Sequence, residues 1–219
     1  MRIYKVHNSK KYRQNYGINL KMELNVQNST ICFQIGLPKH IKNLDLELLS
    51  LNISNFKHIQ NQRFHRCVYK MQQPYKATFL IYSNGKVVVV GFKYIDQLDN
   101  LLAKFMCLIG ETLCKLQTSE ILELKLKKVC IKNIVYSGNF GEKIDLKNFY
   151  NNIRLKCIYE PLIYPALYCF PDAENTKVFI ALFRSGKFFI TGETSNKKIC
   201  KIHNLLQQFS KTFYKYSYL

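Results

Sequence analysis

The order of apolar and polar positions repeats once along the chain. Residues 79–91 run from an apolar stretch through a turn that ends in Gly85-Lys86 to four valines and a glycine. Residues 178–192 repeat that order around Gly186-Lys187, again with four strand-forming residues and a closing glycine. A glycine turn between two runs of β-branched and aromatic residues is typical of a β-hairpin. We therefore predict one hairpin in each half of the chain.

An apolar stripe at helical spacing follows each hairpin. The stripes comprise Leu98, Leu101, Leu102, Phe105, Met106 and Ile109 in the first half, and Ile199, Ile202, Leu205, Leu206 and Phe209 in the second. Steps of three and four residues place these side chains on one side of a helix. Each stripe therefore predicts an amphipathic helix that packs on one face of the sheet.

A weaker repeat lies upstream of each hairpin. Residues 26–31 and 131–136 predict short strands with an asparagine near the start, and residues 44–51 and 146–154 predict short helices. Each half thus has the order strand, helix, strands, helix, and we place the two repeats at residues 21–118 and 119–219. No low-complexity linker separates them, which favours one fused body.

Positive charge dominates the composition. Among 219 residues, 33 are lysine or arginine and 14 are acidic, which gives a formal charge of +19. Such an excess predicts a polyanionic partner, either nucleic acid or an anionic membrane surface. Residues 1–20 contain Arg2, Lys5, Lys10, Lys11 and Arg13 and no acid, and predict a flexible basic arm that attracts phosphates. No apolar run approaches the ~20 residues that span a bilayer. The repeated hairpins do not predict a membrane-surface protein, so we expect nucleic acid and no membrane.

Residues that carry enzyme chemistry are scattered. The eight cysteines form no Cys-x-x-Cys pair, and the five histidines do not cluster. We find no carboxylate cluster, nucleophile elbow, phosphate-binding loop or metal-ligand spacing. The chain is therefore predicted not to be an enzyme and to use no cofactor, no metal and no small-molecule substrate.

The repeated residues resemble the TATA-box-binding protein family. Val26-Gln27-Asn28 and Ile131-Lys132-Asn133 resemble its Leu-Gln-Asn and Ile-Gln-Asn strands, and Tyr82–Lys86 and Phe183–Lys187 resemble its two Ser-Gly-Lys hairpins. Further matches are Leu44-Asp45-Leu46 at its first helix, Gln62-Arg63-Phe64 before its first stirrup loop, and Tyr159–Pro165 at its second stirrup loop. These motifs occur in the family's order and cover most of the chain.

The resemblance implies an α+β fold: a saddle of two pseudo-symmetric repeats, with a curved antiparallel sheet of about ten strands and four helices on the convex face. It also implies that the concave face binds duplex DNA from the minor groove and bends it. Four aromatic wedges, which would enter base steps and unstack them, are then Phe64, Tyr82, Tyr164 and Phe183.

Base contacts follow from the same resemblance. Asn28 and Asn133 would donate to adenine N3 or thymine O2, which the minor groove presents at A·T pairs. The flanking concave positions are Thr30, Val88, Val90, Val135, Phe189 and Thr191. Phosphates would be bound by Arg63, Lys70, Lys86 and Lys187. The expected ligand is therefore AT-rich double-stranded DNA.

The partner surface departs from the family pattern. Tyr159, Glu160, Pro161 and Leu162 occupy the stirrup where the family docks an initiation factor of the IIB type, but Leu162 replaces a glutamate. Cys169 and Phe170 stand where the family has an arginine. This drift is typical of a specialised paralogue or a viral version, with a nuclear location or, for a cytoplasmic DNA virus, a cytoplasmic viral factory.

Two functions remain open from the sequence. In the first, the chain is a transcription initiation factor that binds and bends AT-rich promoter DNA and recruits the polymerase machinery. In the second, it is a scaffold with relaxed or no TATA specificity that acts mainly through protein contacts, because Tyr82, Tyr164 and Val90 alter the concave face. Base preference and bending separate the two.

Overall fold

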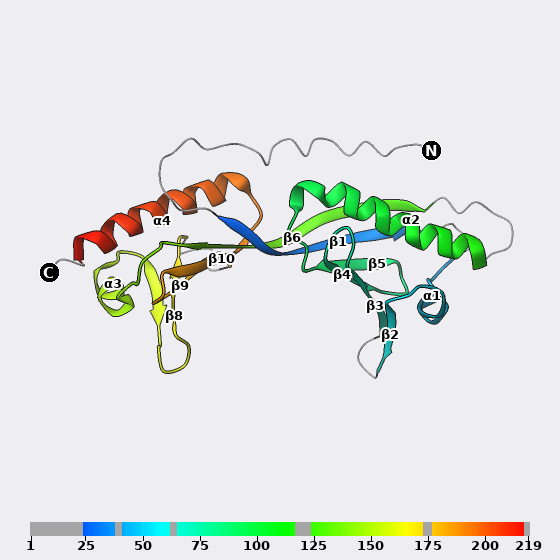
Figure 1. Ribbon diagram of the computed structural model, residues 1–219, viewed down its shortest axis with the longest axis horizontal. Helices are drawn as coiled ribbons and strands as arrows, with labels where there is room; N and C mark the ends of the chain where they lie inside the picture. Colours follow the sequence, from blue (N-terminus) through cyan, green and yellow to red (C-terminus); the bar gives the residue numbers. More distant parts are fainter. Residues whose placement is uncertain (1–23, 38–40, 62–64, 117–123, 173–176, 217–219) are drawn as a thin grey trace. The chain divides into compact units, whose positions relative to one another are not determined.

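The computed structural model describes residues 24–37, 41–61, 65–116, 124–172 and 177–216 (Figure 1). The predicted basic arm, and Arg63 and Phe64, lie outside these residues. In chain order the strands are β1 (Asn25–Gly36), β2 (Phe56–Gln60), β3 (His65–Met71), β4 (Ala77–Ile81), β5 (Lys86–Val90), β6 (Lys125–Asn139), β7 (Lys156–Tyr159), β8 (Ala166–Phe170), β9 (Phe179–Phe183) and β10 (Lys187–Glu193). The helices are α1 (Leu46–Asn52), the 3-10 turn η2 (Ile95–Gln97), α2 (Leu98–Leu116), α3 (Leu146–Asn152) and α4 (Asn196–Tyr216).

The strands follow the hydrogen-bonding order β2-β3-β4-β5-β1-β6-β10-β9-β8-β7. The chain divides into two compact units. Unit 1 holds residues 29–132 and unit 2 holds residues 24–28 and 133–216, counting described residues only. Strands β1 and β6 each contribute one part of their length to each unit, so each unit completes its sheet with residues from both sequence repeats.

The two predicted hairpins are confirmed. Strands β4 and β5 pair as antiparallel neighbours, as do β9 and β10. Gly85 and Gly186 take φ values of 80° and 82°, a left-handed conformation that strains any residue with a side chain. The amide of Gly85 donates to the carbonyl of Tyr82, and the amide of Gly186 donates to that of Phe183. These bonds close each turn and place Tyr82 and Phe183 at equivalent points.

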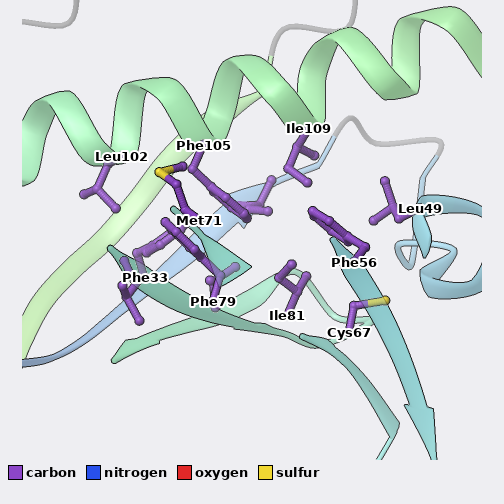
Figure 2. Close-up of a cluster of buried hydrophobic side chains, with 14 of the residues drawn as sticks. Phe33, Leu49, Phe56, Cys67, Met71, Phe79, Ile81, Leu102, Phe105 and Ile109 are labelled. Atoms are coloured by element: carbon purple, nitrogen blue, oxygen red, sulfur yellow. The ribbon is translucent and has the colours of Figure 1, made fainter. Parts of the chain in front are cut away.

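The core of unit 1 lies between the sheet and the predicted amphipathic helix α2. Alternate strand residues such as Ile31, Phe33 and Phe79 are at most 2% exposed (Figure 2). The rings of Phe79 and Phe105 stack with their centroids 4.2 Å apart. Helix α1 completes the cluster with buried Leu46 and Leu49. Burying each large apolar side chain contributes about 1.5–3 kcal/mol, which explains why α2 stays on this face.

Unit 2 is built in the same way around α4. Leu206 and Phe209 from the helix pack with Phe188 from β10 and Phe149 from α3. The rings of Phe149 and Phe209 meet edge to face at 5.0 Å. Gly138 on β6 leaves the space that the ring of Phe188 fills, because a Cβ at this position would overlap that ring.

The short helices are set by aspartate caps. Asp45 accepts a hydrogen bond from the amide of Leu48 at 2.9 Å, so α1 begins at Leu46 and not at Leu44 as predicted. Asp145 caps α3 in the same way, and α3 ends at Asn152, two residues before the predicted end. The predicted helices after each hairpin are confirmed and extend beyond their predicted ends in α2 and α4.

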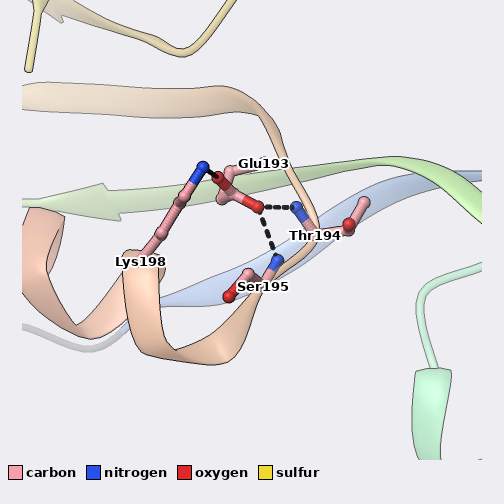
Figure 3. A network of polar contacts seen from close by, with 4 residues as sticks. All are labelled: Glu193, Thr194, Ser195 and Lys198. Atoms are coloured by element: carbon pink, nitrogen blue, oxygen red, sulfur yellow. Dashed lines mark hydrogen bonds and ion pairs between the residues drawn. The ribbon is translucent and has the colours of Figure 1, made fainter. Parts of the chain in front are cut away.

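A carboxylate stabilises the chain where β10 leads into α4. Glu193 is 9% exposed, and its Oε1 accepts from the amides of Thr194 and Ser195 at 2.8 and 2.7 Å (Figure 3). Its Oε2 lies 3.4 Å from Nζ of Lys198. Burial alone would raise the pKa of Glu193, but the hydrogen bonds from Ser195 and Thr194 and the charge of Lys198 lower it below its usual value.

No helix within the described ranges is long and apolar enough to cross a bilayer.

Candidate nucleic-acid interface

Each unit leaves one face of its sheet without helices, which we call its open face. In unit 1 the half-buried or exposed open-face residues are Thr30, Cys32, Gln34, Lys57, Ile59, Arg66, Val68, Lys70, Thr78, Leu80, Lys86, Val88 and Val90. In unit 2 they include Asn133, Val135, Ser137, Lys156, Ile158, Tyr168, Phe170, Phe179, Phe183, Lys187, Phe189 and Thr191. Alternation along each strand separates these side chains from the core.

The strand register of unit 1 aligns several predicted residues in one row. Thr30 lies opposite Val90, Val90 opposite Thr78, and Thr78 opposite Lys70. Val88 lies in the next row, between Cys32 and Leu80. The open face of unit 1 is therefore a mainly aliphatic and hydroxyl surface with a lysine at its edge.

Two of the predicted wedge residues meet in unit 2. The rings of Tyr164 and Phe183 lie 6.2 Å apart at 69°, and Tyr164 is 42% exposed. Tyr82 occupies the equivalent hairpin position in unit 1 and is half-buried. Its expected neighbour Phe64 lies outside the described residues. The two predicted rings thus lie side by side in unit 2, while in unit 1 only Tyr82 is described, and the wedge role stays a prediction.

Asn133 is held by its neighbours on β10. Its Nδ2 donates to Oγ1 of Thr191 at 3.0 Å, and its Oδ1 accepts from that hydroxyl at 3.2 Å and from the amide of Gly192 at 3.0 Å. Because an amide N–H can only donate, the bond from Gly192 fixes which end of the side chain is the oxygen. The NH₂ group of Asn133 has two hydrogens, and the bond to Thr191 uses one of them, so the other can donate to a ligand.

Asn28 is half-buried on β1, two residues before Thr30 on the same side of the strand. It belongs to unit 2, together with Asn133 and Val135. The predicted central asparagines therefore come from a single compact unit, although they belong to different sequence repeats.

Positive charge surrounds both open faces. Lys70, Lys86 and Lys187 are exposed, and the two hairpin lysines follow the turn glycines at equivalent positions. Among described strand residues, neither open face carries an acidic side chain. Phosphates could therefore approach these strand residues without meeting a carboxylate, which favours binding of a polyanion.

The predicted partner surface ends in an apolar tip. The carbonyl of Glu160 accepts from the amides of Ile163 and Tyr164, which folds residues 160–164 into a tight turn. Leu162 and Ile163 are 102% and 80% exposed. Glu160 and Pro161 are also exposed, whereas Tyr159 packs partly against the core of unit 2. Exposed apolar side chains at a loop tip are typical of a protein contact.

Several open-face residues were not among the predicted site residues. Tyr168, Phe170 and Phe179 extend the aromatic surface beyond Tyr164 and Phe183. The alternation Phe179-Ile180-Ala181-Leu182-Phe183 was the available signal, since every second residue shares a face with Phe183.

Among the residues with described positions, no three histidine, cysteine or acidic side chains are placed to hold a metal ion.

Comparison with known proteins identifies relatives over most of the chain. The family described as "Transcription factor TFIID (or TATA-binding protein, TBP)" matches residues 23–112 and 128–215. TATA-box-binding protein 2 of Haloferax volcanii is 32% identical over 170 residues, which cover 77% of this chain and 83% of the relative. The TATA-box-binding protein of Aeropyrum pernix is 31% identical over 161 residues, which cover 71% of each.

A solved structure shares the fold. TBP of Methanococcus jannaschii aligns with a TM-score of 0.67 over 87% of this chain and 99% of its own, at 21% sequence identity. The predicted α+β fold with its antiparallel ten-stranded sheet and four helices is thereby confirmed.

Proposed function

Because the chain belongs to the TATA-binding protein family, we propose that it is a transcription initiation factor that binds AT-rich promoter DNA through the minor groove, bends it, and recruits the transcription machinery. The observation that carries this proposal is that the described strand residues of both open faces include no acid, while in each unit an aromatic residue and a lysine flank the hairpin turn. Aromatic rings that enter base steps unstack them and kink the duplex, while lysines bind the phosphates on either side.

Base preference would come from the asparagines and their neighbours. The minor groove distinguishes A·T from G·C mainly through the amino group of guanine. Val88, Val90 and Val135 offer apolar contacts that leave no partner for that amino group. The oriented NH₂ of Asn133 supplies a donor for adenine N3 or thymine O2. Together they favour A·T pairs.

A bending assay tests the proposal. An AT-rich and a GC-rich duplex, each labelled at both ends for energy transfer, are titrated with the full chain. We expect the protein to bind the AT-rich duplex more tightly. We also expect it to bring the two labelled ends of that duplex closer together, which increases energy transfer. Salt-sensitive binding without base preference or bending would instead support the scaffold function.

The variant Phe183→Ala separates the wedge from general attraction. It removes the ring that meets Tyr164, so we expect reduced bending with a nearly unchanged association rate, since charge governs the encounter. Tyr150→Ala is the control, because Tyr150 is an exposed ring on α3, away from the open face. Equal bending by the Phe183 variant and the control would contradict the wedge role.

The exposed stirrup of unit 2 is the proposed docking surface for a factor of the IIB type. Leu162 presents an apolar side chain where the family has a glutamate, which implies a partner adapted to this chain. A standard IIB-type factor should therefore add weakly to the protein–DNA complex in a gel-shift assay. Leu162→Glu should strengthen that addition, and an equal effect of Ile163→Glu would show that the gain reflects charge alone.

The proposed role requires binding and no catalysis. The comparisons concern DNA-binding factors, and the described strand residues of the open faces are apolar, amide, hydroxyl or basic, groups suited to binding DNA. A role in initiation also implies a location where the promoter DNA resides, which is the nucleus or, for a cytoplasmic DNA virus, the viral factory.

A further inference from the structure

The two open faces differ at positions that the strand register makes equivalent. The matched hairpins place Val88 of unit 1 where unit 2 has Phe189. The pairs Thr78–Val90 and Phe179–Thr191 make Phe179 the counterpart of Thr78. On the next strands, Val68 and Lys70 correspond to Tyr168 and Phe170. At all of these places unit 1 has an aliphatic, hydroxyl or cationic side chain and unit 2 has an aromatic ring.

The rings of unit 2 form a continuous surface, which we call the aromatic array: Tyr164, Tyr168, Phe170, Phe179, Phe183 and Phe189. Phe179 is its centre, with ring centroids 5.5 Å from Tyr168, 6.4 Å from Phe170 and 6.1 Å from Phe189. Phe183 contacts Phe189 at 6.0 Å, and Tyr164 stacks on Tyr168 at 5.8 Å. All of the rings remain at least partly exposed.

Among the described strand residues of unit 1, none matches the rings of Tyr168, Phe170, Phe179 and Phe189. The described strands of unit 1 place no ring on their open face, since Phe33, Phe56 and Phe79 all lie in the core beneath α2. Ala181 is fully buried in the middle of the array, although strand alternation puts it on the open face. Rings therefore cover it, and the array is a thick aromatic layer rather than scattered residues.

A stacked duplex offers most of these rings no base face to stack on. The minor groove presents base edges and sugars, whereas the flat faces of bases are hidden by stacking except where a step is pried open. Tyr164 and Phe183 are sufficient for one such step. Phe170, Phe179 and Phe189 extend along the sheet beyond it, where stacking would require bases that are already unpaired.

The charge around the array fits the same ligand. Nζ of Lys156 lies 6.0 Å from the ring centroid of Phe170, and Lys187 is exposed beside Phe189. Burial, followed by the neighbouring Tyr164, raises the pKa of Tyr168, so this phenol adds no negative charge beside the lysines. Open antiparallel sheets that bind single strands combine exposed rings, on which bases stack, with lysines that follow the backbone.

We propose that the aromatic array of unit 2 binds unpaired bases of a single DNA strand by stacking. The inference rests on the proposed promoter function and extends it: the wedge and asparagine residues hold the duplex, while Phe170, Phe179 and Phe189 beyond the wedge take bases of an opened or easily melted segment. The asymmetry of the two faces then also gives the bound protein a direction along the DNA.

Polarisation titrations of the full chain with a labelled oligo-thymidine strand and with an AT-rich duplex test this proposal. The double variant Phe179→Thr, Phe189→Val introduces the residues that unit 1 has at the same register, which the same type of sheet accommodates. We expect its affinity for the single strand to fall by at least about tenfold, since alanine substitution of one stacking ring already costs that much. Tyr150→Ala is the control and should bind as the wild type.

Outcomes of the two titrations are separable. Single-strand affinity that falls in the double variant while circular dichroism stays unchanged supports the array as a stacking surface. Single-strand affinity that is equal in wild type and variant would overturn it and leave the rings as a protein contact, even if the duplex is still bent. If the wild type binds the single strand but does not bend the AT-rich duplex in the energy-transfer assay, the promoter function is overturned instead. The reciprocal Val88→Phe variant should raise single-strand affinity.

A different observation concerns the hairpin that carries the stirrup. Cys157 on β7 and Cys169 on β8 are directly opposed in the register, with their sulfur atoms 3.1 Å apart. Opposed residues of an antiparallel pair have Cα atoms about 4.5–5.5 Å apart, within the range that a disulfide spans. The hydrogen bond between the two thiols lowers the pKa of Cys157 and, together with burial, raises the pKa of Cys169. Cys157 is half-buried, whereas Cys169 is fully buried.

We infer that Cys157 and Cys169 form a reversible disulfide on exposure to a small disulfide such as oxidised glutathione. The Cys157 thiolate attacks one glutathione sulfur and expels the other as a thiolate. The Cys169 sulfur, after losing its proton, then attacks Sγ of Cys157 and expels the second glutathione, so that two thiols become one disulfide and two glutathiones are reduced. The bridge ties together the two strands on either side of Tyr164.

Mass spectrometry of the full chain after treatment with oxidised glutathione tests this inference. We expect a mass lower by two hydrogens, a peptide that links Cys157 to Cys169, and slower amide exchange in β7 and β8. Cys157→Ser should abolish these changes, and the exposed Cys107→Ser should not. A final product in which Cys157 carries glutathione, or pairs with another cysteine, would overturn the inference.

Discussion

Replacing Glu193 by glutamine removes a buried charge but keeps the shape of the side chain. Hydrogen bonds to a charged acceptor contribute about 1.5–3 kcal/mol each, against about 0.5–1.5 kcal/mol for neutral ones. The glutamine oxygen can still accept from Thr194 and Ser195, so each bond weakens by about 1 kcal/mol. Lys198 is 59% exposed and adds at most a few tenths. Relief from burying the charge offsets part of this loss, which leaves a net cost of about 1–2 kcal/mol.

The cost should depend on pH in one direction. The folded pKa of Glu193 is lowered, so its contribution to stability is complete above the unfolded pKa of about 4.3 and is lost as the pH falls through the folded value. The stability gap between wild type and Glu193→Gln should therefore be full near neutral pH. It should close only in acid, below about pH 4.

Urea unfolding followed by far-ultraviolet circular dichroism measures this gap, since the chain has no tryptophan for fluorescence. In thermal unfolding the same cost should lower Tm by about 2–4 °C for each kcal/mol in a chain of this size. The exposed Glu111 on α2 gives the control variant Glu111→Gln, which should change little. A gap for Glu193→Gln that persists unchanged into acid would refute the proposed role of the charge.

Three further changes test the interface and its support. Lys187→Ala should weaken DNA binding evenly across sequences and flatten the dependence of log K on log salt by about 0.9; an unchanged slope would exclude a phosphate contact. Thr191→Val introduces the residue that unit 1 has at Val90 and removes the hydroxyl that holds Asn133. Competition between AT-rich and GC-rich duplexes should then show a weaker preference for A·T, and the free energy of unfolding should fall by about 1 kcal/mol. An undiminished preference would show that Asn133 needs no orientation. Gly138→Ala should cost about 1–3 kcal/mol in urea unfolding because Phe188 must move, and an equal midpoint would contradict that packing.

Local sequence signals were sufficient for the hairpins and long helices. A left-handed glycine and a regular apolar stripe are visible within a few neighbouring residues, so Gly85, Gly186 and the stripes of α2 and α4 located these elements. The edge strands β2 and β7 were not located. They have five and four residues, and each pairs with a single neighbour, so tertiary contacts rather than their own sequence define them.

The candidate site was predictable at the hairpins and less so between them. The turn geometry gives the equivalent positions of Tyr82 and Phe183 and of Lys86 and Lys187, while their DNA-binding roles come from the family resemblance and stay predictions. The bonding of Asn133 depends on an irregularity in the register between β10 and β6, which brings the Gly192 amide to its side chain. A bulge of this kind changes which residues meet across two strands far apart in sequence, and no local pattern reveals it.

The way β1 and β6 serve both units has a consequence for how the protein is made. Residues 24–28 leave the ribosome early, yet their place in unit 2 exists only after residues 133–139 have followed. Unit 1 likewise lacks the adjoining part of β6 until residue 132 has emerged. Neither unit can therefore be completed from its own sequence repeat alone: unit 1 needs the chain up to residue 132, and unit 2 needs the residues that follow. Pairing between segments so distant in sequence slows folding. Until its partner strand has been synthesised, the edge of β1 stays unpaired and can pair with other chains.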